Sequence, residues 1–248
     1  GPGADVIRQM GDKVEARAAM QAAGVPVIPG SDGSLTGIDE ALSLAESIGY
    51  PVMLKATSGG GGRGIRRCNS ASELRRHYDR VLSEAGKAFG RAEIFMEKCV
   101  ERPRHIEVQI LADAHGNVVH LYERDCSIQR RHQKLIEVAP SPQLDEAQRN
   151  WLGETAVRAA QAVGYENAGT VEFLMDRDSN FRFMEMNTRL QVEHTITEAI
   201  TGIDIVQEQI RIADGLPLGF AQADIKRRGF AMELRINAED PQNDFLPS

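Results

Sequence analysis

The chain has few cysteines, no long apolar run and no excess of positive charge. Its three cysteines, Cys68, Cys99 and Cys126, are odd in number and far apart in the sequence. This pattern argues against a disulfide framework or a zinc site, and it predicts a reducing compartment, the cytoplasm. No apolar run approaches the roughly 20 residues that a membrane helix needs. The net charge of −7 argues against a general surface for nucleic acid or anionic membrane.

The residues that are present describe a globular protein. Hydrophobic residues make up 42% and charged residues 26% of the 248 positions, which is enough chain for one large or two small domains with a sizeable core. The N-terminus carries no signal-peptide pattern. The abrupt start at Gly1 and the end at Ser248, which lacks a closing helix or strand, predict a piece of a longer protein.

The most polar stretch is residues 183–194, FMEMNTRLQVEH. It begins as a strand with period-2 alternation, in which Glu185 and Asn187 share a face. Carboxylate and amide oxygens on one strand face suit a hard cation such as Mg²⁺, and the donors of Arg189 suit an oxyanion. Glu193 adds a further carboxylate. A polar edge strand is the alternative, but the flanking Phe and Met residues predict partial burial, where charges need partners.

The predicted strands 170–175 and 181–187 form a hairpin whose register decides whether two acids meet. Strict alternation places Phe183 on the same face as Glu185. A four-residue loop puts Glu172 directly across from Glu185, whereas a five-residue loop puts the two acids on opposite faces, because a one-residue slip flips every side chain. We predict the four-residue loop and a divalent metal between the acids, since facing carboxylates repel without a cation.

A glycine tract, SGGGGRG at residues 58–64, follows a predicted strand at 50–55. Consecutive glycines let backbone N–H groups converge on one anion, and Lys55 and Arg63 add positive charge. The tract is not a P-loop, because no G-K-[ST] follows. A flexible linker is the alternative. Apolar residues resume at once after Gly64, which favours a strand–loop–strand hairpin over a ligand.

Other polar residues indicate further contacts with anions. Lys13 lies in the first turn of a helix predicted at 12–23, where a cation opposes the helix dipole, so it either reaches an anion or is a solvated surface lysine. Residues 124–134, RDCSIQRRHQK, contain three arginines, a histidine and a lysine, and predict a local anion site or an exposed basic loop. His105 lies on the polar face of an alternating strand at 104–111 and, taken alone, would be solvated.

Together these motifs resemble biotin carboxylase, the ATP-grasp component of biotin-dependent carboxylases. The resemblance covers nearly the whole chain, in the same order as in the family. The runs that carry it are KA with the glycine tract at 55–64, MEK at 96–98, PRHIE at 103–107, ERDCSIQRRHQK at 123–134, EMNTRLQVEH at 185–194 and RINAEDP at 235–241.

The resemblance implies an α+β fold, the ATP-grasp fold, in which two α+β subdomains clasp ATP. Residues 1–27 are then a lead-in helix and connector of the central domain. Residues 28–100 are the lid subdomain with the glycine-rich loop, and residues 101–248 are the core subdomain with the metal, bicarbonate and biotin site. The family's N-terminal doubly wound domain and its C-terminal domain are expected to lie outside this chain.

The resemblance also implies an enzyme, an ATP-dependent ligase. Bicarbonate attacks the γ-phosphate of ATP to give carboxyphosphate, and the carboxyl group passes to N1 of biotin on a carrier protein. The implied cofactors are ATP and two Mg²⁺ or Mn²⁺ ions, with biotin as a carrier-bound substrate. The implied partners are a biotin carboxyl carrier domain, a carboxyltransferase that chooses the final acceptor, and a second copy in a homodimer, with no nucleic acid and no membrane.

Two alternatives stand beside this interpretation. Another ATP-grasp ligase, such as a carbamoyl-phosphate synthetase half or an amino-acid ligase, shares the metal-binding acids but lacks the RLQVEH run at 189–194. A non-catalytic fragment of the same fold would bind the nucleotide without turnover.

The resemblance assigns roles to individual residues. Glu193 is implied as the base that deprotonates bicarbonate and Arg235 as the group that stabilises the biotin enolate; Lys134 and Arg189 complete the catalytic set. The implied bicarbonate pocket consists of Lys134, Arg189, Gln191 and the backbone of Val192. The implied metal ligands are Glu172, Glu185 and Asn187. The implied ATP-binding residues are Lys13, Lys55, Gly60, Gly61, Gly62, Arg63, Gly64, Glu97, Lys98, Val100, His105, Gln129 and His132.

Overall fold

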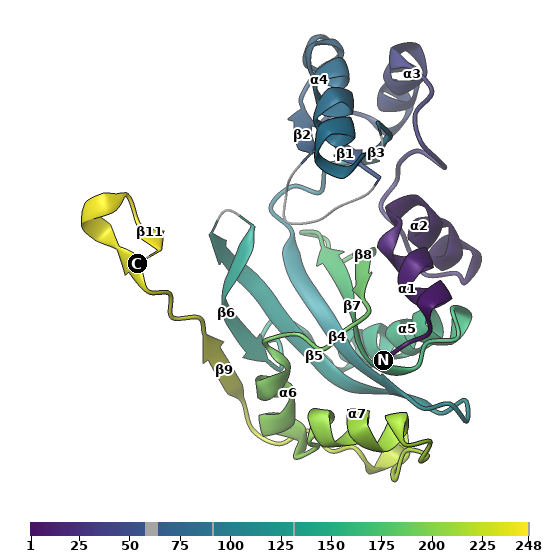
Figure 1. Cartoon of the computed structure of the whole chain (residues 1–248), viewed down its shortest axis with the longest axis vertical. Coiled ribbons are helices and arrows are strands. Elements are labelled where there is room, and N and C mark those ends of the chain that lie inside the picture. The colour runs from purple at the N-terminus through teal and green to yellow at the C-terminus, as the bar shows by residue number, and fades with distance from the viewer. Residues whose placement is uncertain (58–63, 91, 131, 248) are drawn as a thin grey trace.

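The computed structural model describes residues 1–57, 64–90, 92–130 and 132–247. Within them the chain forms a small and a large antiparallel sheet, each covered by its own helices (Figure 1). The small sheet has the strand order β2-β1-β3, and the large sheet has the order β8-β7-β4-β5-β6-β9. None of the helices in these residues is long and apolar enough to cross a membrane.

The small sheet and two helices enclose one hydrophobic cluster. Leu54 and Met96 contribute to it from the sheet, and Leu74 and Val81 from the longer helix, all fully buried. The elements are α3 (Ile38–Ile48), β1 (Val52–Ala56), β2 (Ile65–Cys68), α4 (Ala71–Phe89) and β3 (Ile94–Lys98). β1 and β2 pair antiparallel, with Lys55 opposite Ile65, so the predicted strand–loop–strand hairpin is confirmed for its strands. Its loop, residues 58–63, lies outside the described residues.

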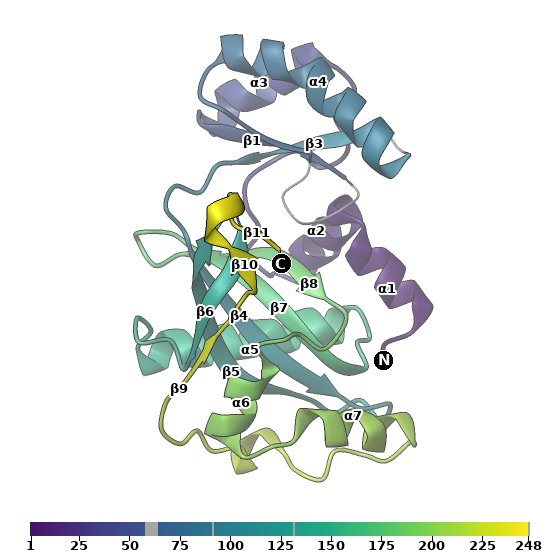
Figure 2. The same ribbon diagram turned by 60° about the vertical axis from the view of Figure 1, so that its left-hand side comes forward.

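The large sheet has helices on both faces (Figure 2). On β4, Ile106, Val108 and Ile110 join the cluster that packs beneath α2 and α5. Leu111 points the other way and packs with Ile205 of α7. The elements are α1 (Ala4–Gly11), α2 (Lys13–Ala22), β4 (Arg104–Ala112), β5 (Val118–Arg130), β6 (Gln133–Ala139), α5 (Glu146–Ala162), β7 (Asn167–Met175), β8 (Phe181–Asn187), α6 (His194–Thr201), α7 (Ile205–Ala213) and β9 (Ala231–Leu234).

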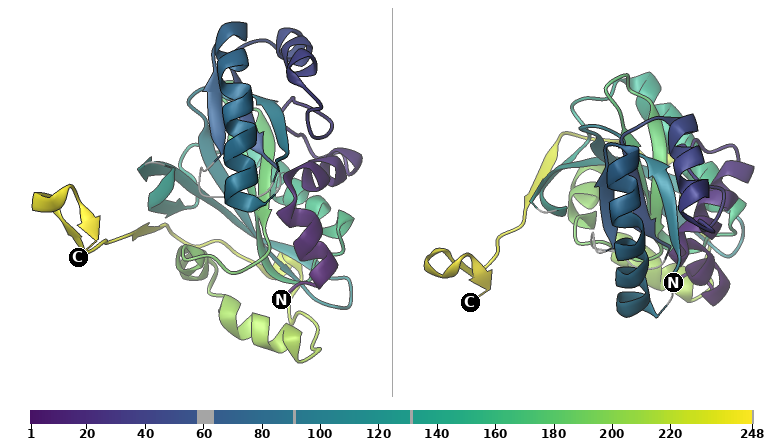
Figure 3. Two further views of the ribbon diagram at one scale, coloured as in Figure 1. Left: turned by 45° about the horizontal axis from the view of Figure 1, so that its top comes forward. Right: turned by 90° about the horizontal axis from the view of Figure 1, so that it is seen from above.

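The end of the chain departs from the large sheet. After β9 the backbone projects away from the body of the molecule (Figure 3). Short elements complete the chain: η1 (Gln222–Asp224), β10 (Glu239–Asp240), η2 (Pro241–Asn243) and β11 (Leu246–Pro247).

Local sequence signals explain several helix ends. The Asp12 side chain accepts hydrogen bonds from the backbone of Val14 and Glu15, so it caps α2 as predicted. Asp145 and Gln148 form a capping box at the start of α5. Gly49 ends α3 with φ +77°, a conformation that glycine adopts without strain.

The β7–β8 hairpin has the predicted pairing of acids but not the predicted loop. Met175 pairs with Phe181, which leaves a five-residue connection, and the prediction of four residues is wrong. The ladder then shifts by one residue between Glu172 and its neighbour, and Glu172 pairs with Glu185. A β-bulge at Met184 supplies the extra residue, and it restores the facing of the acids that the longer loop would have abolished.

The same bulge corrects the predicted faces of β8. Phe183 pairs with Phe173 and joins the hydrophobic core with Phe181 and Met186, whereas Glu185 pairs with the next residue of β7, Glu172, which faces the other way. The prediction that Phe183 and Glu185 share a face is therefore wrong, because strict alternation fails where a strand carries an extra residue.

Residues 1–27 contain two helices, where the sequence predicted one. α1 and α2 both bury apolar side chains against the large sheet, among them Met10 and Met20. The backbone of Phe183 on β8 donates to Pro26 O at 2.7 Å, which ties the connector to the edge of that sheet. The predicted domain boundaries at 27/28 and 100/101 stay predictions.

A buried histidine predicts a pH dependence of stability. The His120 ring packs where a Cβ at Gly153 of α5 would come within 2.5 Å of it, and burial lowers the pKa of His120 to about 4. The unfolded chain has an ordinary histidine pKa of about 6.5. As pH falls through this window, only the unfolded state takes up the proton, so the unfolding free energy decreases.

We expect His120→Gln to flatten this dependence. The loss of unfolding free energy between pH 7 and pH 5 should be about 2 kcal/mol smaller in the variant than in the wild type. Urea unfolding of both proteins at the two pH values measures it. Equal losses in the two proteins would show that His120 is not the group responsible.

Candidate active site

A pocket of about 1120 Å³ is lined by residues of the small sheet, α2, strands of the large sheet and the segment after β8. It gathers nearly all the predicted site residues. Those that line it are Lys13, Lys55, Glu97, Lys98, Val100, His105, Gln129, His132, Lys134, Glu172, Glu185, Asn187, Arg189, Gln191, Val192, Glu193 and Arg235. Among the described residues Gly64 is an exception: its carbonyl accepts from Ala56 N and closes the β1–β2 hairpin. Gly60, Gly61, Gly62 and Arg63 lie outside the described residues.

Lys134 is the central cation of the pocket. Its Nζ donates to Glu107 Oε2 at 2.5 Å, to Glu172 Oε1 at 3.0 Å and to Glu193 Oε1 at 2.5 Å. Burial opposes the charged form, but the charges of Glu107 and Glu172 outweigh it and raise the pKa of Lys134 far above its ordinary value. Lys134 is therefore a permanent positive charge, suited to hold an anion and unsuited to act as a base.

Glu193 lies between two cations at this end of the pocket. It directly precedes α6, and its residue is only 2% exposed. Lys134 binds its Oε1, and Arg235 NH2 donates to its Oε2 at 2.8 Å. The segment between β8 and α6 thus delivers a buried carboxylate to the point where β6 and the residue after β9 present their cations.

Glu172 is surrounded by donors. His105 Nε2 lies 2.9 Å from its Oε2, and the amides of Asn187 and Gln191 both donate to its Oε1 at 2.9 Å. Burial alone would raise the pKa of Glu172, but the hydrogen bond and charge of His105, together with Lys134, hold it far below its ordinary value. Glu172 is therefore ionised and available to a cation.

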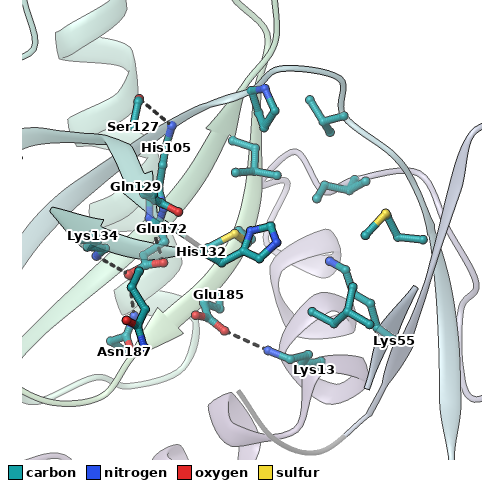
Figure 4. Close-up of a pocket in the computed structure, with 18 of the residues that line it drawn as sticks. Lys13, Lys55, His105, Ser127, Gln129, His132, Lys134, Glu172, Glu185 and Asn187 are labelled. Carbon is teal, nitrogen blue, oxygen red and sulfur yellow. Dashed lines mark hydrogen bonds and ion pairs between the residues drawn. The ribbon is translucent and has the colours of Figure 1, made fainter. Parts of the chain in front are cut away.

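The other end of the pocket carries further cations (Figure 4). Lys13 Nζ donates to Glu185 Oε2 at 2.8 Å, so the anion that it reaches in this structure is an acid of β8. Lys55 of β1 pairs with Glu97 of β3. Lys98 is directed to the backbone and donates to Gly49 O at 2.9 Å. Lys13 and Lys55 lie across the pocket from Lys134, an arrangement that suits a long polyanion.

The remaining predicted residues line the pocket in two ways. The Gln129 amide donates to His105 Nδ1 at 2.9 Å and to Cys126 O at 2.8 Å. Nε2 on the other side of the ring is directed at Glu172, 2.9 Å from its Oε2. Arg189 and His132 have exposed side chains, free to contact a ligand.

The predicted metal ligands form a suitable set of donors. Glu172 and Glu185 face each other across β7 and β8, and Asn187 lies on the pocket side of the same strand. Two carboxylates and an amide supply only oxygen, which is the donor set that Mg²⁺ and Mn²⁺ prefer. The residues present therefore fit a divalent metal.

The family model described as "Carbamoyl-phosphate synthase L chain, ATP binding domain" matches residues 12–221. The chain belongs to this family. Biotin carboxylase 2 of Bacillus subtilis (strain 168) is 56% identical over 248 residues, which are 100% of this chain and 56% of that protein. The chain therefore spans about half the length of the curated relatives it matches.

Solved structures agree over the whole chain. The biotin carboxylase domain dimer of the Hydrogenobacter thermophilus 2-oxoglutarate carboxylase, in complex with MgADP, ADP and bicarbonate, has a TM-score of 0.95 at 55% identity. A biotin carboxylase complex from Campylobacter jejuni has a TM-score of 0.95 at 53% identity. Each match covers 100% of this chain and 55% of the other. The predicted α+β ATP-grasp fold and the resemblance to biotin carboxylase are confirmed.

For this ATP-binding family member, sequence reasoning missed a buried polar layer beneath the pocket. Arg124 is fully buried and donates to Glu107, Gln109, Thr170, Gln191 and Thr197. The signal was present in the sequence, because two of its partners alternate on the polar face of the strand 104–111. Of that face only His105, taken alone, was expected to be solvated, and no role was given to Glu107 and Gln109, which are fully buried beside Arg124 of β5.

The basic run at 124–134 is divided between the interior and the pocket. Arg124 enters the interior, whereas Arg130, His132 and Lys134 line the pocket, and Arg130 also pairs with Glu239 at 2.6 Å. Strict alternation would place Arg124 and Arg130 on one face, but the register of β5 against β6 shifts between Asp125 and Gln129, which allows the division. The sequence had left a local anion site and an exposed basic loop as alternatives for this run.

Proposed function

We propose that the chain is the ATP-grasp part of a biotin carboxylase, which uses ATP and bicarbonate to carboxylate biotin on a carrier protein. The observation that carries the proposal is the position of Glu193: it is a buried carboxylate held between Lys134 and Arg235, at one end of a pocket whose other end presents Lys13 and Lys55. A relative at 55% identity was solved with MgADP and bicarbonate, which supports both ligands here.

In the first step bicarbonate binds beside Glu193. Lys134, Arg189, Gln191 and the backbone of Val192 hold it, and Glu193 accepts its proton. The bicarbonate oxygen then attacks the γ-phosphorus of ATP, the bond to ADP breaks and carboxyphosphate forms. Lys134 neutralises charge beside the bicarbonate, and Lys13 and Lys55 neutralise charge along the phosphates.

Glu172, Glu185 and Asn187 would hold the divalent metals. When bound, these ions shield the phosphate oxygens and align them for in-line attack. The residues of the chain must also exclude water, because carboxyphosphate hydrolyses readily. The glycine tract, predicted as a lid over the phosphates, is assigned this task in the proposal.

In the second step the carbon–oxygen bond of carboxyphosphate breaks, and the phosphate that leaves takes the proton of biotin N1. The carboxyl group passes to N1, and Arg235 stabilises the enolate of the ureido ring. In this proposal biotin is attached to a carrier domain, and a carboxyltransferase uses the carboxylated biotin. We also propose a homodimer, because a relative's domain was solved as a dimer. The three free cysteines support a reducing compartment such as the cytoplasm.

The division into residues 1–27, 28–100 and 101–248 is part of the proposal. It is supported by separate hydrophobic clusters under the small and the large sheet. In this arrangement residues 28–100 act as the lid subdomain and bring Lys55 and Glu97 to the nucleotide, while residues 101–248 supply the metal, bicarbonate and biotin groups.

The test is ATP cleavage by the full-length protein. We expect cleavage to require bicarbonate and to be stimulated by free biotin. Stimulation by an amine or an amino acid instead of biotin would favour another ATP-grasp ligase. Nucleotide binding without any cleavage would favour a non-catalytic nucleotide-binding protein.

A further inference from the structure

A buried acid without an assigned role lies behind Arg235. Glu137 of β6 is fully buried, and its Oε1 accepts a hydrogen bond from Arg235 Nε at 2.7 Å. Its other oxygen, Oε2, is also buried and has no hydrogen-bond partner among the described residues. Glu137 is not one of the described residues that line the pocket. Its contact with the pocket is therefore made through Arg235.

This arrangement is costly for the fold. Burial raises the pKa of Glu137, although the charge of Arg235 opposes the change. A buried acceptor left without a partner destabilises the folded protein, because it has lost its hydrogen bond to water. An apolar side chain at this position of β6 would avoid the cost, so packing alone does not account for an acid there.

The contact determines how Arg235 presents its donors. The Arg235 backbone N–H donates to Leu135 O at 2.9 Å, which ties the residue to β6 just beyond the end of β9. Glu137 accepts the hydrogen bond from Nε of the guanidinium, and Glu193 accepts one from NH2 at 2.8 Å. An arginine side chain loses rotamer entropy when it is held in one place, and Glu137 holds it before a ligand arrives.

A neighbouring acid shows that the contact is selective. Glu233 of β9 is the direct cross-strand partner of Glu137. Its Oε2 accepts from Thr195 Oγ1 at 2.5 Å, whereas Arg235 donates to Glu137 and Glu193. Arg235 is thus clamped between an acid behind it and the acid at the reacting centre.

We propose that Glu137 is a positioning residue that holds the Arg235 guanidinium in place between Glu193 and the biotin ring. The inference rests on the proposed function, because that function gives Arg235 its ligand. Glu137 acts on the second step, through Arg235, and leaves the nucleotide end of the pocket untouched.

Glu137→Gln in the full-length protein tests the inference. The amide keeps the size of the side chain and one acceptor but removes the charge. We expect kcat/KM for free biotin in the ATP-cleavage assay to fall about tenfold, while the Kd for ATP changes less than twofold. Glu137→Asp keeps the charge but shortens the reach, so its kcat/KM for biotin should lie between the values of the wild type and Glu137→Gln. Unchanged biotin kinetics in Glu137→Gln would overturn the proposal.

Two matched controls separate positioning from structure. Glu233→Gln alters the cross-strand partner of Glu137 but not the clamp. Glu123→Gln alters a buried glutamate with the same pattern, since its Oε1 accepts from Arg149 Nε at 2.8 Å and its Oε2 lacks a partner among the described residues. Both should retain wild-type biotin kinetics. An equal loss in Glu123→Gln would mean that any buried charge removal has this effect.

A double-mutant cycle tests whether Glu137 acts through Arg235. In an Arg235→Gln background, Glu137→Gln should cause no further loss in kcat/KM for biotin. Independent, multiplicative losses would contradict the proposed route.

A readout without turnover distinguishes the two proposals. In protein labelled with ¹⁵N-arginine, Nε–H of Arg235 should exchange with solvent about tenfold faster in Glu137→Gln than in the wild type. If Nε–H of Arg235 exchanges slowly in the wild type but biotin does not stimulate ATP cleavage, the proposed function fails, and the positioning role fails with it. If biotin stimulates cleavage and Glu137→Gln changes neither readout, the positioning role alone fails.

Discussion

Glu193→Gln is expected to lower bicarbonate-dependent ATP cleavage by about 10²–10⁴-fold, the range that a general base contributes. The amide keeps the shape of the side chain, but its single oxygen can accept from only one of Lys134 and Arg235, whose donors lie 2.5 and 2.8 Å from the two carboxylate oxygens. It cannot accept the proton of bicarbonate. Because Lys13, Lys55 and Glu97 lie at the other end of the pocket, the Kd for ATP should change less than twofold.

Steady-state cleavage and direct nucleotide binding together measure this split. Glu233→Gln is the matched control, since it alters a nearby carboxylate that binds Thr195 and has no proposed role. Equal losses in turnover and in ATP affinity would contradict a base and would instead indicate a general disturbance of the pocket.

Arg124→Met is expected to reduce the unfolding free energy by about 3–5 kcal/mol, the usual result of removing one partner from a buried ion pair. Burial opposes the charge of Arg124, but the carboxylate of Glu107 outweighs it and raises the pKa of the guanidinium. The variant would leave Glu107 fully buried without the Arg124 charge, although Lys134 would remain as a partner cation. Gln109 and Gln191 would also lose a donor.

Urea unfolding of the variant and the wild type at pH 7 measures the loss. Arg130→Met is the matched control from the same strand. It also removes an arginine bonded to a glutamate, Glu239, but the Arg130 side chain is solvent-exposed, so the midpoint should not move. Similar midpoints for Arg124→Met and the wild type would show that the buried layer does not stabilise the fold.

Much of the fold could be predicted because its signals are local. α3 ends at a glycine, whereas α5 and α7 each begin at an aspartate whose side chain accepts a hydrogen bond from a backbone N–H of the first turn. The acids of the hairpin were correctly expected to face each other, but the bulge at Met184 that causes it leaves no mark in the alternation of residues. The expected four-residue loop therefore gave the right pairing of the two acids, although the loop in fact has five residues.

The residues of the candidate site were predicted from motifs, whereas the buried residues that hold them in place were not. Residues of the pocket are concentrated in short polar runs, which a resemblance can assign one by one. Arg124 and Glu137 are embedded in strands and act through partners more than ten residues away. Whether a polar side chain of a strand faces water or another sheet residue depends on the tertiary fold, so the sequence alone gave neither position its observed role.

The central claim is that bicarbonate itself attacks the γ-phosphate beside Glu193. The most direct measurement is ATP cleavage by the full-length protein, with and without biotin, in bicarbonate labelled with ¹⁸O, followed by mass analysis of the phosphate released. Our account predicts that an oxygen atom of bicarbonate appears in the phosphate, because carboxyphosphate breaks between carbon and the bridging oxygen. Phosphate that carries oxygen from water alone would contradict it.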